Sequence, residues 1–362
     1  MGPRCSGQGR AARPVLVAVA CLALLIGGAA PVAAEPDGVP SPHTLCIIDD
    51  ERLPAISGMV ADGDHWYVVN DGGWRLEVYV LDRDCVVREV RTDDTNPFDV
   101  EDLARGPDGT LWLSDTGDNH RERDTVALHE LAPDGRATLY RLTYPDGPRD
   151  AEALLLDRDG VPHIVTKTET GRPGVYRPEE PLRSPGPTPL ERVAELTISP
   201  TDTTGGPAGF LGSVLVTGGA VSADGGVIAL RTYTDAYLFA APDGDVVAAL
   251  QREPVRIPLP DEPQGEALAF EPDGTLLSTS EGVGQPVRAV PGAVQLVSDP
   301  PEDQGGAGER ASEPAAISGA IEATGWIDVW RSPERLAVIA AGGLAVILVI
   351  AVATWRARRS HR

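Results

Sequence analysis

The stretch Arg149-Asp-Ala-Glu-Ala-Leu-Leu-Leu-Asp-Arg-Asp-Gly160 decides the fold: an acidic residue, Glu152, opens an apolar run that ends at an Asp-Gly turn. The arrangement returns in VEDLARGPDG, which contains Glu101, and in GEALAFEPDG, which contains Glu266. In all three stretches the glutamate precedes the aspartate of the Asp-Gly pair by seven residues. A short apolar run that ends at an Asp-Gly turn and is followed by a second apolar run predicts a β-hairpin. The chain therefore contains at least three related hairpins.

Each hairpin begins a longer unit, because two weaker strand patterns follow it. Two further units keep this shape with Ser57 or Thr217 at the glutamate position. The five units start at 57, 101, 152, 217 and 266, with spacings of 44, 51, 65 and 49 residues. Repeats of about 40 to 50 residues with four strands each are typical of β-propellers. The sequence therefore predicts an all-β propeller of five four-stranded blades over residues 44–297, and the long third unit leaves room for a sixth blade.

The two ends of the repeat region predict how the ring closes. The last unit lacks a fourth strand, and a spare strand, Thr44–Ile48, precedes the first unit. An N-terminal strand that completes the last blade would remove the open edge of the sheet. Cys46 and Cys85 are the two cysteines that remain after the N-terminal leader described next, so we expect them to form a disulfide between the last and first blades. The Pro-, Gly- and acid-rich residues 298–335 predict a flexible stalk.

The chain ends predict the cellular location. Residues 1–34 have basic residues, an apolar run and a small-residue cleavage site, as in a signal peptide; lipidation at Cys21 is the weaker alternative. Residues 336–354 form an uncharged apolar run long enough to span a bilayer. The tail, residues 355–362, contains four arginines, and basic tails prefer the cytoplasmic side. We therefore expect a single-pass membrane protein with its N-terminal domain extracellular.

The charge of the chain excludes one large class of partner. The formal net charge is −23, and all 54 acidic residues lie between the predicted leader and the predicted membrane helix. Such a surface repels phosphate backbones, so we expect no nucleic-acid partner. An acidic surface suits cations, or serves solubility alone.

Hairpin pairing brings the charged residues together at one face of the predicted disc. Counted from the Asp-Gly turns, Glu152 lies opposite Lys167, the only lysine of the chain, and Glu266 lies opposite Glu281. Two facing carboxylates repel, so they are protonated, point into water or share a cation. Calcium and magnesium prefer carboxylate oxygens. We therefore predict a divalent-cation site with the candidate ligands Glu101, Asp115, Glu152, Glu266 and Glu281.

Other residues at this face are candidates for holding a ligand. Lys167 and Arg231 could bind an anionic group, although Glu152 and Lys167 could equally form an ordinary cross-strand ion pair. The loops add three further candidates, Asp71, Asp118 and Asn119.

The repeat pattern resembles that of secreted bacterial β-propellers of the phytase-like esterase and gluconolactonase-like families. The resemblance rests on the Glu-Ala or Glu-Asp-Leu-Ala units and on VTGGAVSADG and RTYTDAY in the fourth unit, and it covers about Ser57 to Gln285. It implies a propeller fold, a divalent metal at the channel mouth and, in some members, hydrolysis of phosphoesters or lactones. It also implies roles in such a site for Glu101, Glu152 and Glu266.

Two functions from different classes follow. The first is a membrane-anchored propeller that binds a small molecule or a protein, with a cation at its channel mouth. The second is a metal-dependent hydrolase of small esters, lactones or phosphoesters, in which the metal activates water and Glu152 is the candidate general base. No paired-His zinc motif and no Gly-x-Ser-x-Gly nucleophile motif is present, which favours binding over catalysis.

Overall fold

The computed structural model describes residues 39–298. The chain divides into two units, 1–303 and 304–362, and the second lies wholly outside the described residues. No helix within residues 39–298 is long and apolar enough to cross a membrane. The predicted signal peptide (1–34), membrane helix (336–354), tail (355–362) and all but the first residue of the predicted stalk (298–335) also fall outside the described part.

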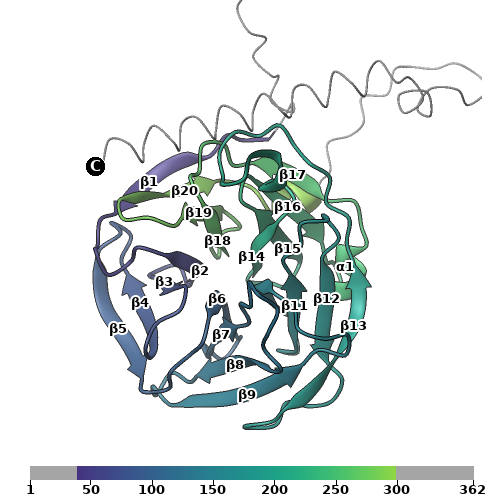
Figure 1. Cartoon of the computed structure of the whole chain (residues 1–362). Coiled ribbons are helices and arrows are strands. Elements are labelled where there is room, and N and C mark those ends of the chain that lie inside the picture. The colour runs from purple at the N-terminus through teal and green to yellow at the C-terminus, as the bar shows by residue number, and fades with distance from the viewer. Residues whose placement is uncertain (1–38, 299–362) are drawn as a thin grey trace, which may run out of the picture. The chain divides into compact units, whose positions relative to one another are not determined.

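Twenty β-strands, arranged in sets of four around a centre, account for nearly all of the regular secondary structure of the described chain (Figure 1). We call the sets blades 1 to 5. Blade 1 contains β2 (Ile56–Ala61), β3 (Trp66–Asn70), β4 (Leu76–Leu81) and β5 (Val87–Asp93). Blade 2 contains β6 (Val100–Arg105), β7 (Leu111–Asp115), β8 (Val126–Leu131) and β9 (Ala137–Thr143). Blade 3 contains β10 (Ala151–Leu156), β11 (Pro162–Thr166), β12 (Gly174–Pro178) and β13 (Thr188–Glu195).

The last two blades complete the ring. Blade 4 contains β14 (Val216–Val221), β15 (Val227–Thr232), β16 (Asp235–Ala240) and β17 (Val255–Pro258). Blade 5 contains β18 (Gly265–Phe270), β19 (Leu276–Ser280), β20 (Gln285–Val290) and β1 (His43–Ile48). Helical structure in the described part is limited to η1 (Gly209–Leu211), α1 (Val246–Leu250) and α2 (Gln295–Ser298). The expected all-β, propeller-like architecture is confirmed.

The number of hydrogen-bonded sheets differs from the expected five. Blades 2 and 3 form one eight-stranded sheet, because the outer strands β9 and β13 pair in parallel. The pairing covers two residue pairs, Thr188↔Leu142 and Pro189↔Thr143. An outer strand has unpaired backbone groups along one edge. β13, the longest of the described strands, extends far enough to pair with the free edge of β9.

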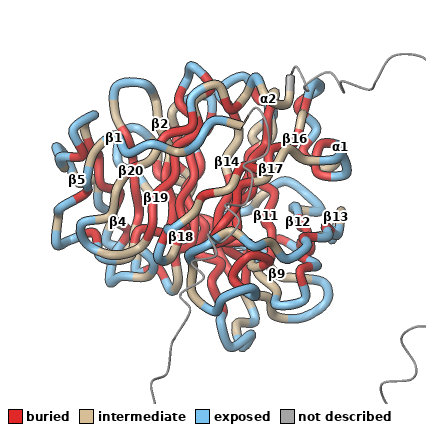
Figure 2. Tube along the Cα trace, turned by 90° about the horizontal axis from the view of Figure 1, so that it is seen from above, coloured by how far each residue is buried: buried red, intermediate tan, exposed pale blue. Residues whose placement is uncertain are grey.

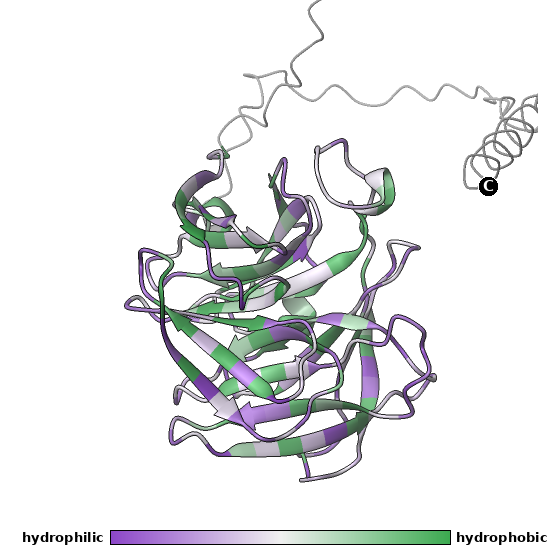
Figure 3. Ribbon diagram, turned by 60° about the vertical axis from the view of Figure 1, so that its left-hand side comes forward, coloured by the Kyte–Doolittle hydropathy of each residue, from purple (hydrophilic) through white to green (hydrophobic). Residues whose placement is uncertain are grey.

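The apolar core consists of five clusters, each shared by two neighbouring blades. One cluster, for example, joins Met59 and Trp66 of blade 1 to Ala267 and Leu277 of blade 5. The other four clusters join blades 1 and 2, 2 and 3, 3 and 4, and 4 and 5. Inner strands are therefore buried on both faces (Figure 2), which explains their weak apolar–polar alternation in sequence. Outer strands such as β5, β9 and β13 contain few buried residues, and apolar and polar residues interleave along strands at the surface in Figure 3.

The N-terminal strand closes the ring as expected. β1 pairs antiparallel with β20 and becomes the outer strand of blade 5. The disulfide Cys46–Cys85, with 5.9 Å between the Cα atoms, joins β1 to the turn between β4 and β5 of blade 1. It therefore links the two blades at which the ring closes.

We expect loss of this disulfide to lower the free energy of unfolding by about 2–4 kcal/mol, because the bridge restricts the unfolded chain. Urea denaturation of Cys46→Ser/Cys85→Ser beside the oxidised wild type measures the difference. Two free thiols in the purified wild-type protein, counted by mass spectrometry, would contradict the bridge itself.

Candidate metal centre at the channel mouth

Every inner strand carries a β-bulge at the same position. In blade 3, Ala151 pairs with Thr166 and Ala153 with Val165, which leaves Glu152 unpaired between them. The unpaired residues of the five inner strands are Ser57, Glu101, Glu152, Thr217 and Glu266. A bulge changes the direction of the side chain that it carries. Each glutamate that recurs in the sequence is thus the bulge residue of its inner strand, and Ser57 and Thr217 take this position in the other two blades.

Two groups of carboxylates meet around Glu101. Oxygens of Asp71, Asp99 and Glu101 lie within 4.8 Å of one another, and so do oxygens of Glu101, Asp150 and Glu152. Glu101 belongs to both groups, so five carboxylates from blades 1, 2 and 3 form one continuous acidic cluster. We call these five residues the acidic centre.

Asp99 and Asp150 were not among the residues expected from the sequence. Each stands two residues before a bulge glutamate, so Asp-x-Glu occurs at 99–101 and again at 150–152. This repeated triplet was the available signal. It was missed because the aspartates fall just before the strand and not within it.

A glycine makes room for the acidic centre in blade 2. The Gly117 N–H donates to the carbonyl of Asp99, just as the Lys167 N–H donates to the carbonyl of Asp150 in blade 3. The two residues are therefore equivalent, yet blade 2 has no side chain here. A Cβ atom on Gly117 would overlap Glu101 Oε1 and Asp99 Oδ2.

Lys167 is the cation nearest to these carboxylates. Its ammonium forms an ion pair with Glu152 Oε1 and donates to the Tyr233 hydroxyl at 2.8 Å. Burial alone would lower the pKa of Lys167, but the charges of Glu152 and Glu266 raise it, so the side chain stays protonated. Glu152 is only 2% exposed, and its Oε2 has no hydrogen-bond partner among the described residues. The expected Glu152–Lys167 contact is confirmed.

The acidic centre carries more negative charge than its protein surroundings stabilise. Burial, and then the hydrogen bond and charge of Asp71, raise the pKa of Asp99 to about 7. Burial and the charge of Glu152 raise the pKa of Glu101 well above its ordinary value. Burial and the charge of Glu266 do the same to the pKa of Glu152. A cation would relieve this repulsion.

A pH dependence follows for the protein in chelator. The pKa of Asp99 rises from 3.8 to about 7 on folding, so the folded state binds more protons than the unfolded state between these values. The free energy of unfolding that Asp99 contributes therefore decreases as pH rises through this interval. We expect the free energy of unfolding of the wild type, minus that of Asp99→Asn, to decrease as pH increases. Thermal melting of both proteins across this interval measures it. A difference that is constant or rises with pH would contradict the assignment.

Glu266 and Glu281 lie outside the acidic centre. Glu266 is buried and accepts a hydrogen bond from Gln264 Nε2 at 3.4 Å. The Glu281 N–H donates to the carbonyl of Gln264, so the bulge places Glu281 beside Gln264 and not directly opposite Glu266. Burial is the first cause that raises the pKa of Glu266, and the charge of Glu281 adds to it.

Asp115, an expected metal ligand, is not part of the acidic centre, although its carboxylate accepts a hydrogen bond from the backbone N–H of Asp99 at 2.9 Å. It pairs with Val100 in the strand register and binds Arg123 at 2.9 Å and His129 at 3.0 Å. Although burial acts in the opposite direction, the His129 hydrogen bond and the Arg123 charge lower the pKa of Asp115 to about 2. Its charge is therefore already compensated, and Asp99 takes the place expected for it.

Arg231, expected to hold a ligand, is a buried link between blades 4 and 5. It is 0% exposed and donates to Glu262 Oε2 at 2.7 Å. Its other hydrogen bonds go to the backbone carbonyls of Thr232, Tyr233, Ala267 and Thr279. The structure therefore does not bring Arg231 into contact with the acidic centre.

The three candidates in the loops lie in different surroundings. Asp71 joins the acidic centre. Asp118 is buried and accepts from the N–H groups of Glu122 and Arg123 at 2.9 Å each, while its own N–H donates to Asp150 at 2.8 Å. Asp118 thus supports the acidic centre through its backbone, and Asn119 is exposed in the same loop.

Comparison with known proteins finds similarity to solved structures only. No family model and no curated protein matches the chain. A solved gluconolactonase from Xanthomonas campestris is 19% identical over 69% of this chain and 79% of its own, with a TM-score of 0.38. A luciferin-regenerating enzyme is 15% identical over 66% of this chain and 78% of its own, with a TM-score of 0.40. The soluble aldose sugar dehydrogenase of Escherichia coli is 12% identical over 69% of this chain and 99% of its own, with a TM-score of 0.41. At these identities and scores the likeness carries no argument about activity.

Proposed function

We propose that this protein is a propeller whose channel mouth binds a divalent cation, calcium or magnesium, and uses it to hold a small-molecule ligand. The observation that carries the proposal is the acidic centre, in which five carboxylates meet beside one ammonium group. The buried Glu152 Oε2, which has no hydrogen-bond partner among the described residues, is the second observation that supports a bound cation.

The residues present fit such a cation. All donors of the acidic centre are carboxylate oxygens, the ligands that calcium and magnesium prefer. Gly117 keeps the space beside Glu101 and Asp99 free of a side chain. When bound, the cation would supply positive charge that attracts and polarises an anionic or carbonyl oxygen.

A second candidate function is hydrolysis of a small ester, lactone or phosphoester. The arrangement of Glu152 favours it: one oxygen is fixed by Lys167, which Tyr233 holds in turn, and the other is unpartnered. A carboxylate held in this way can accept a proton from water. Lys167 would orient Glu152.

A substrate screen separates the two functions. The purified protein is incubated with aliphatic lactones, aryl esters and phosphoesters, with calcium or with chelator. Turnover that needs the metal and is lost in Glu152→Gln supports hydrolysis. Binding of calcium or magnesium without turnover of any substrate supports the binding function, and absence of binding of both cations by calorimetry overturns both functions.

We also propose, from the sequence, that a C-terminal helix anchors the propeller outside the cell membrane. Truncation before Leu336 is expected to release a soluble protein into the medium, because nothing between the predicted leader and that position is apolar enough to span a bilayer. Immunoblots of medium and membrane fractions test this. Retention of the truncated protein in the membrane would indicate another anchor, with lipidated Cys21 the first to examine.

A further inference from the structure

Three aromatic rings of residues 39–298 are exposed, and each lies on a segment next to residues of the channel mouth. Trp74 is 91% exposed, Phe98 is 72% exposed and Phe210 is 68% exposed, and the remaining aromatic side chains of the described part are buried or half-buried. All three lie on loops that carry or contact the channel mouth. Single exposed apolar side chains are ordinary, but three exposed aromatic rings on segments next to one acidic centre point to a ligand.

Each ring is tied to a residue of the mouth. Trp74 lies on the loop that begins with Asp71 at the end of β3. Phe98 directly precedes Asp99, and its ring is stacked against Arg123 at 4.6 Å. Because Arg123 is itself held by Asp115 at 2.9 Å, the Phe98 ring is fixed beside the acidic centre.

Phe210 is linked to the mouth through Tyr233. It lies on the long loop between blades 3 and 4. The carbonyl of Gly212 in this loop accepts from the N–H of Tyr233, the residue that binds Lys167. Gly206 of the same loop packs so closely that a Cβ atom there would lie 2.8 Å from Tyr233 Cβ.

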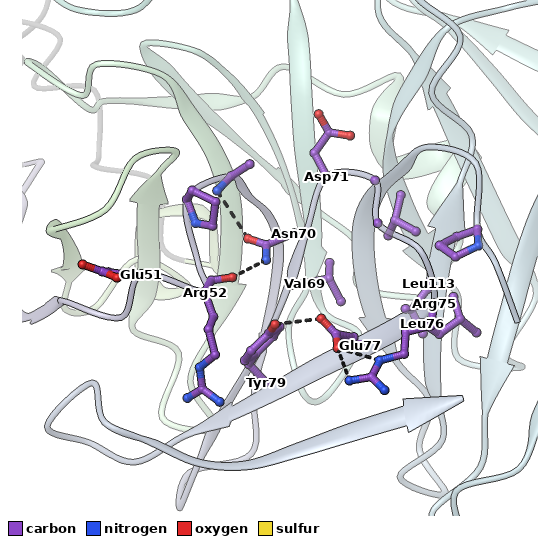
Figure 4. Close-up of a pocket in the computed structure, with 16 residues that line it drawn as sticks. Glu51, Arg52, Val69, Asn70, Asp71, Arg75, Leu76, Glu77, Tyr79 and Leu113 are labelled. Carbon is purple, nitrogen blue, oxygen red and sulfur yellow. Dashed lines mark hydrogen bonds and ion pairs between the residues drawn. The ribbon is translucent and has the colours of Figure 1, made fainter. Parts of the chain in front are cut away.

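A side pocket of about 360 Å³ lies next to the segments that carry the first two rings, and Figure 4 shows residues that line it. Its lining includes Asp71, the two glycines that precede Trp74, and Pro97, which precedes Phe98, so both rings adjoin the pocket without lining it. Apolar side chains of β3, β4, β6 and β7 contribute to it, namely Val69, Leu76, Val100 and Leu113. The volume is in the range of small-molecule pockets.

Two of the charged residues that line the side pocket pair with each other, and Arg52 pairs with Asp50 outside it. Arg75 and Tyr79 both bind Glu77, at 2.8 Å each, and Asp71 lies apart from this network (Figure 4). The pocket therefore has apolar walls and aromatic side chains on the adjoining segments. One of its lining residues, Asp71, belongs to the acidic centre.

We propose that the ligand is a small organic anion with a flat apolar body, such as an aromatic carboxylate. This inference rests on the proposed cation site, because an anion approaches five carboxylates only when a cation compensates them. The carboxylate of the ligand binds the cation at Asp71 and Asp99. Its flat body contacts the Trp74 and Phe98 rings and enters the side pocket, with Phe210 covering it from the loop between blades 3 and 4.

The test uses 2-naphthoate as the probe, with acetate and 2-naphthalenemethanol as matched compounds that lack the flat body or the charge. Calorimetry measures binding of each to the full-length protein with calcium and with chelator. We expect 2-naphthoate to bind at least tenfold more tightly than either matched compound, and only with calcium. Trp74→Ala and Phe210→Ala should each weaken 2-naphthoate at least fivefold and leave calcium affinity unchanged, whereas Val86→Ala, at an exposed apolar residue in the turn between β4 and β5, should change neither.

The outcomes are distinguishable. If calcium binds but 2-naphthoate binds no better than acetate, the ligand assignment is wrong and the cation site stands. If 2-naphthoate binds equally well in chelator, the rings bind without the cation and the assignment is also wrong. If Trp74→Ala instead separates a dimer into monomers in sedimentation, the rings contact a second copy of the chain. If neither calcium nor magnesium binds, both the assignment and the proposed function fall.

Discussion

Replacement of Arg231 by methionine is expected to lower the free energy of unfolding by about 3–5 kcal/mol, the usual cost of breaking a buried ion pair by removing one partner. The guanidinium is 0% exposed and lies 2.7 Å from Glu262. Its loss leaves the Glu262 carboxylate buried with only the Ser278 hydroxyl as a side-chain partner. It also removes hydrogen bonds from four backbone carbonyls in blades 4 and 5.

The same substitution at an exposed ion pair is the matched control. Arg177 and Glu191 also form a 2.8 Å pair, but their side chains are 44% and 42% exposed. Arg177→Met should therefore change stability by about 1 kcal/mol or less. Urea denaturation of both variants measures the difference. Equal effects of the two substitutions would show that Arg231 does not act as a buried link between blades.

Calcium at a thousandfold excess over its dissociation constant is expected to raise the free energy of unfolding by about 4.1 kcal/mol, because it binds only the folded acidic centre. Gly117→Ala should abolish this gain without changing any charge. The added methyl group would occupy the space in which the carboxylates of Glu101 and Asp99 lie, so the two side chains must move apart. Thermal melting with calcium, magnesium and chelator measures the effect.

Three variants test whether the stabilisation by calcium depends on the acidic centre. Gly226→Ala also adds a methyl group near a carboxylate, Asp224 at 3.1 Å, but in a turn between β14 and β15, so the calcium response should persist. In chelator, Glu266→Gln should raise stability because it removes one repelling charge, whereas Glu152→Gln should lower it because Lys167 loses its partner. If neither calcium nor magnesium moves the melting temperature of the wild type, the acidic centre holds no cation.

Local patterns in the sequence were enough to predict much of the fold. The seven-residue spacing between glutamate and Asp-Gly marks a hairpin, and its return marks the blades. The spare strand and the incomplete last unit predicted the closure through β1 and β20, and the cysteine count predicted the Cys46–Cys85 bridge. The Glu152–Lys167 pair was predictable too, because both residues belong to one hairpin and hairpin register is set locally.

Which charged residues form the acidic centre was decided only by the tertiary structure. A shift of one residue in register moves a side chain to the other face of a strand, and the bulge at each inner strand makes such a shift. It turns Glu101 into the channel and leaves Asp115 between Arg123 and His129. Asp71, Asp99 and Asp150 meet because three blades converge at one channel, a contact between residues distant in sequence. The chain alone thus determined the repeat and its closure, whereas the packing of neighbouring blades determined which carboxylates lie within reach of one cation.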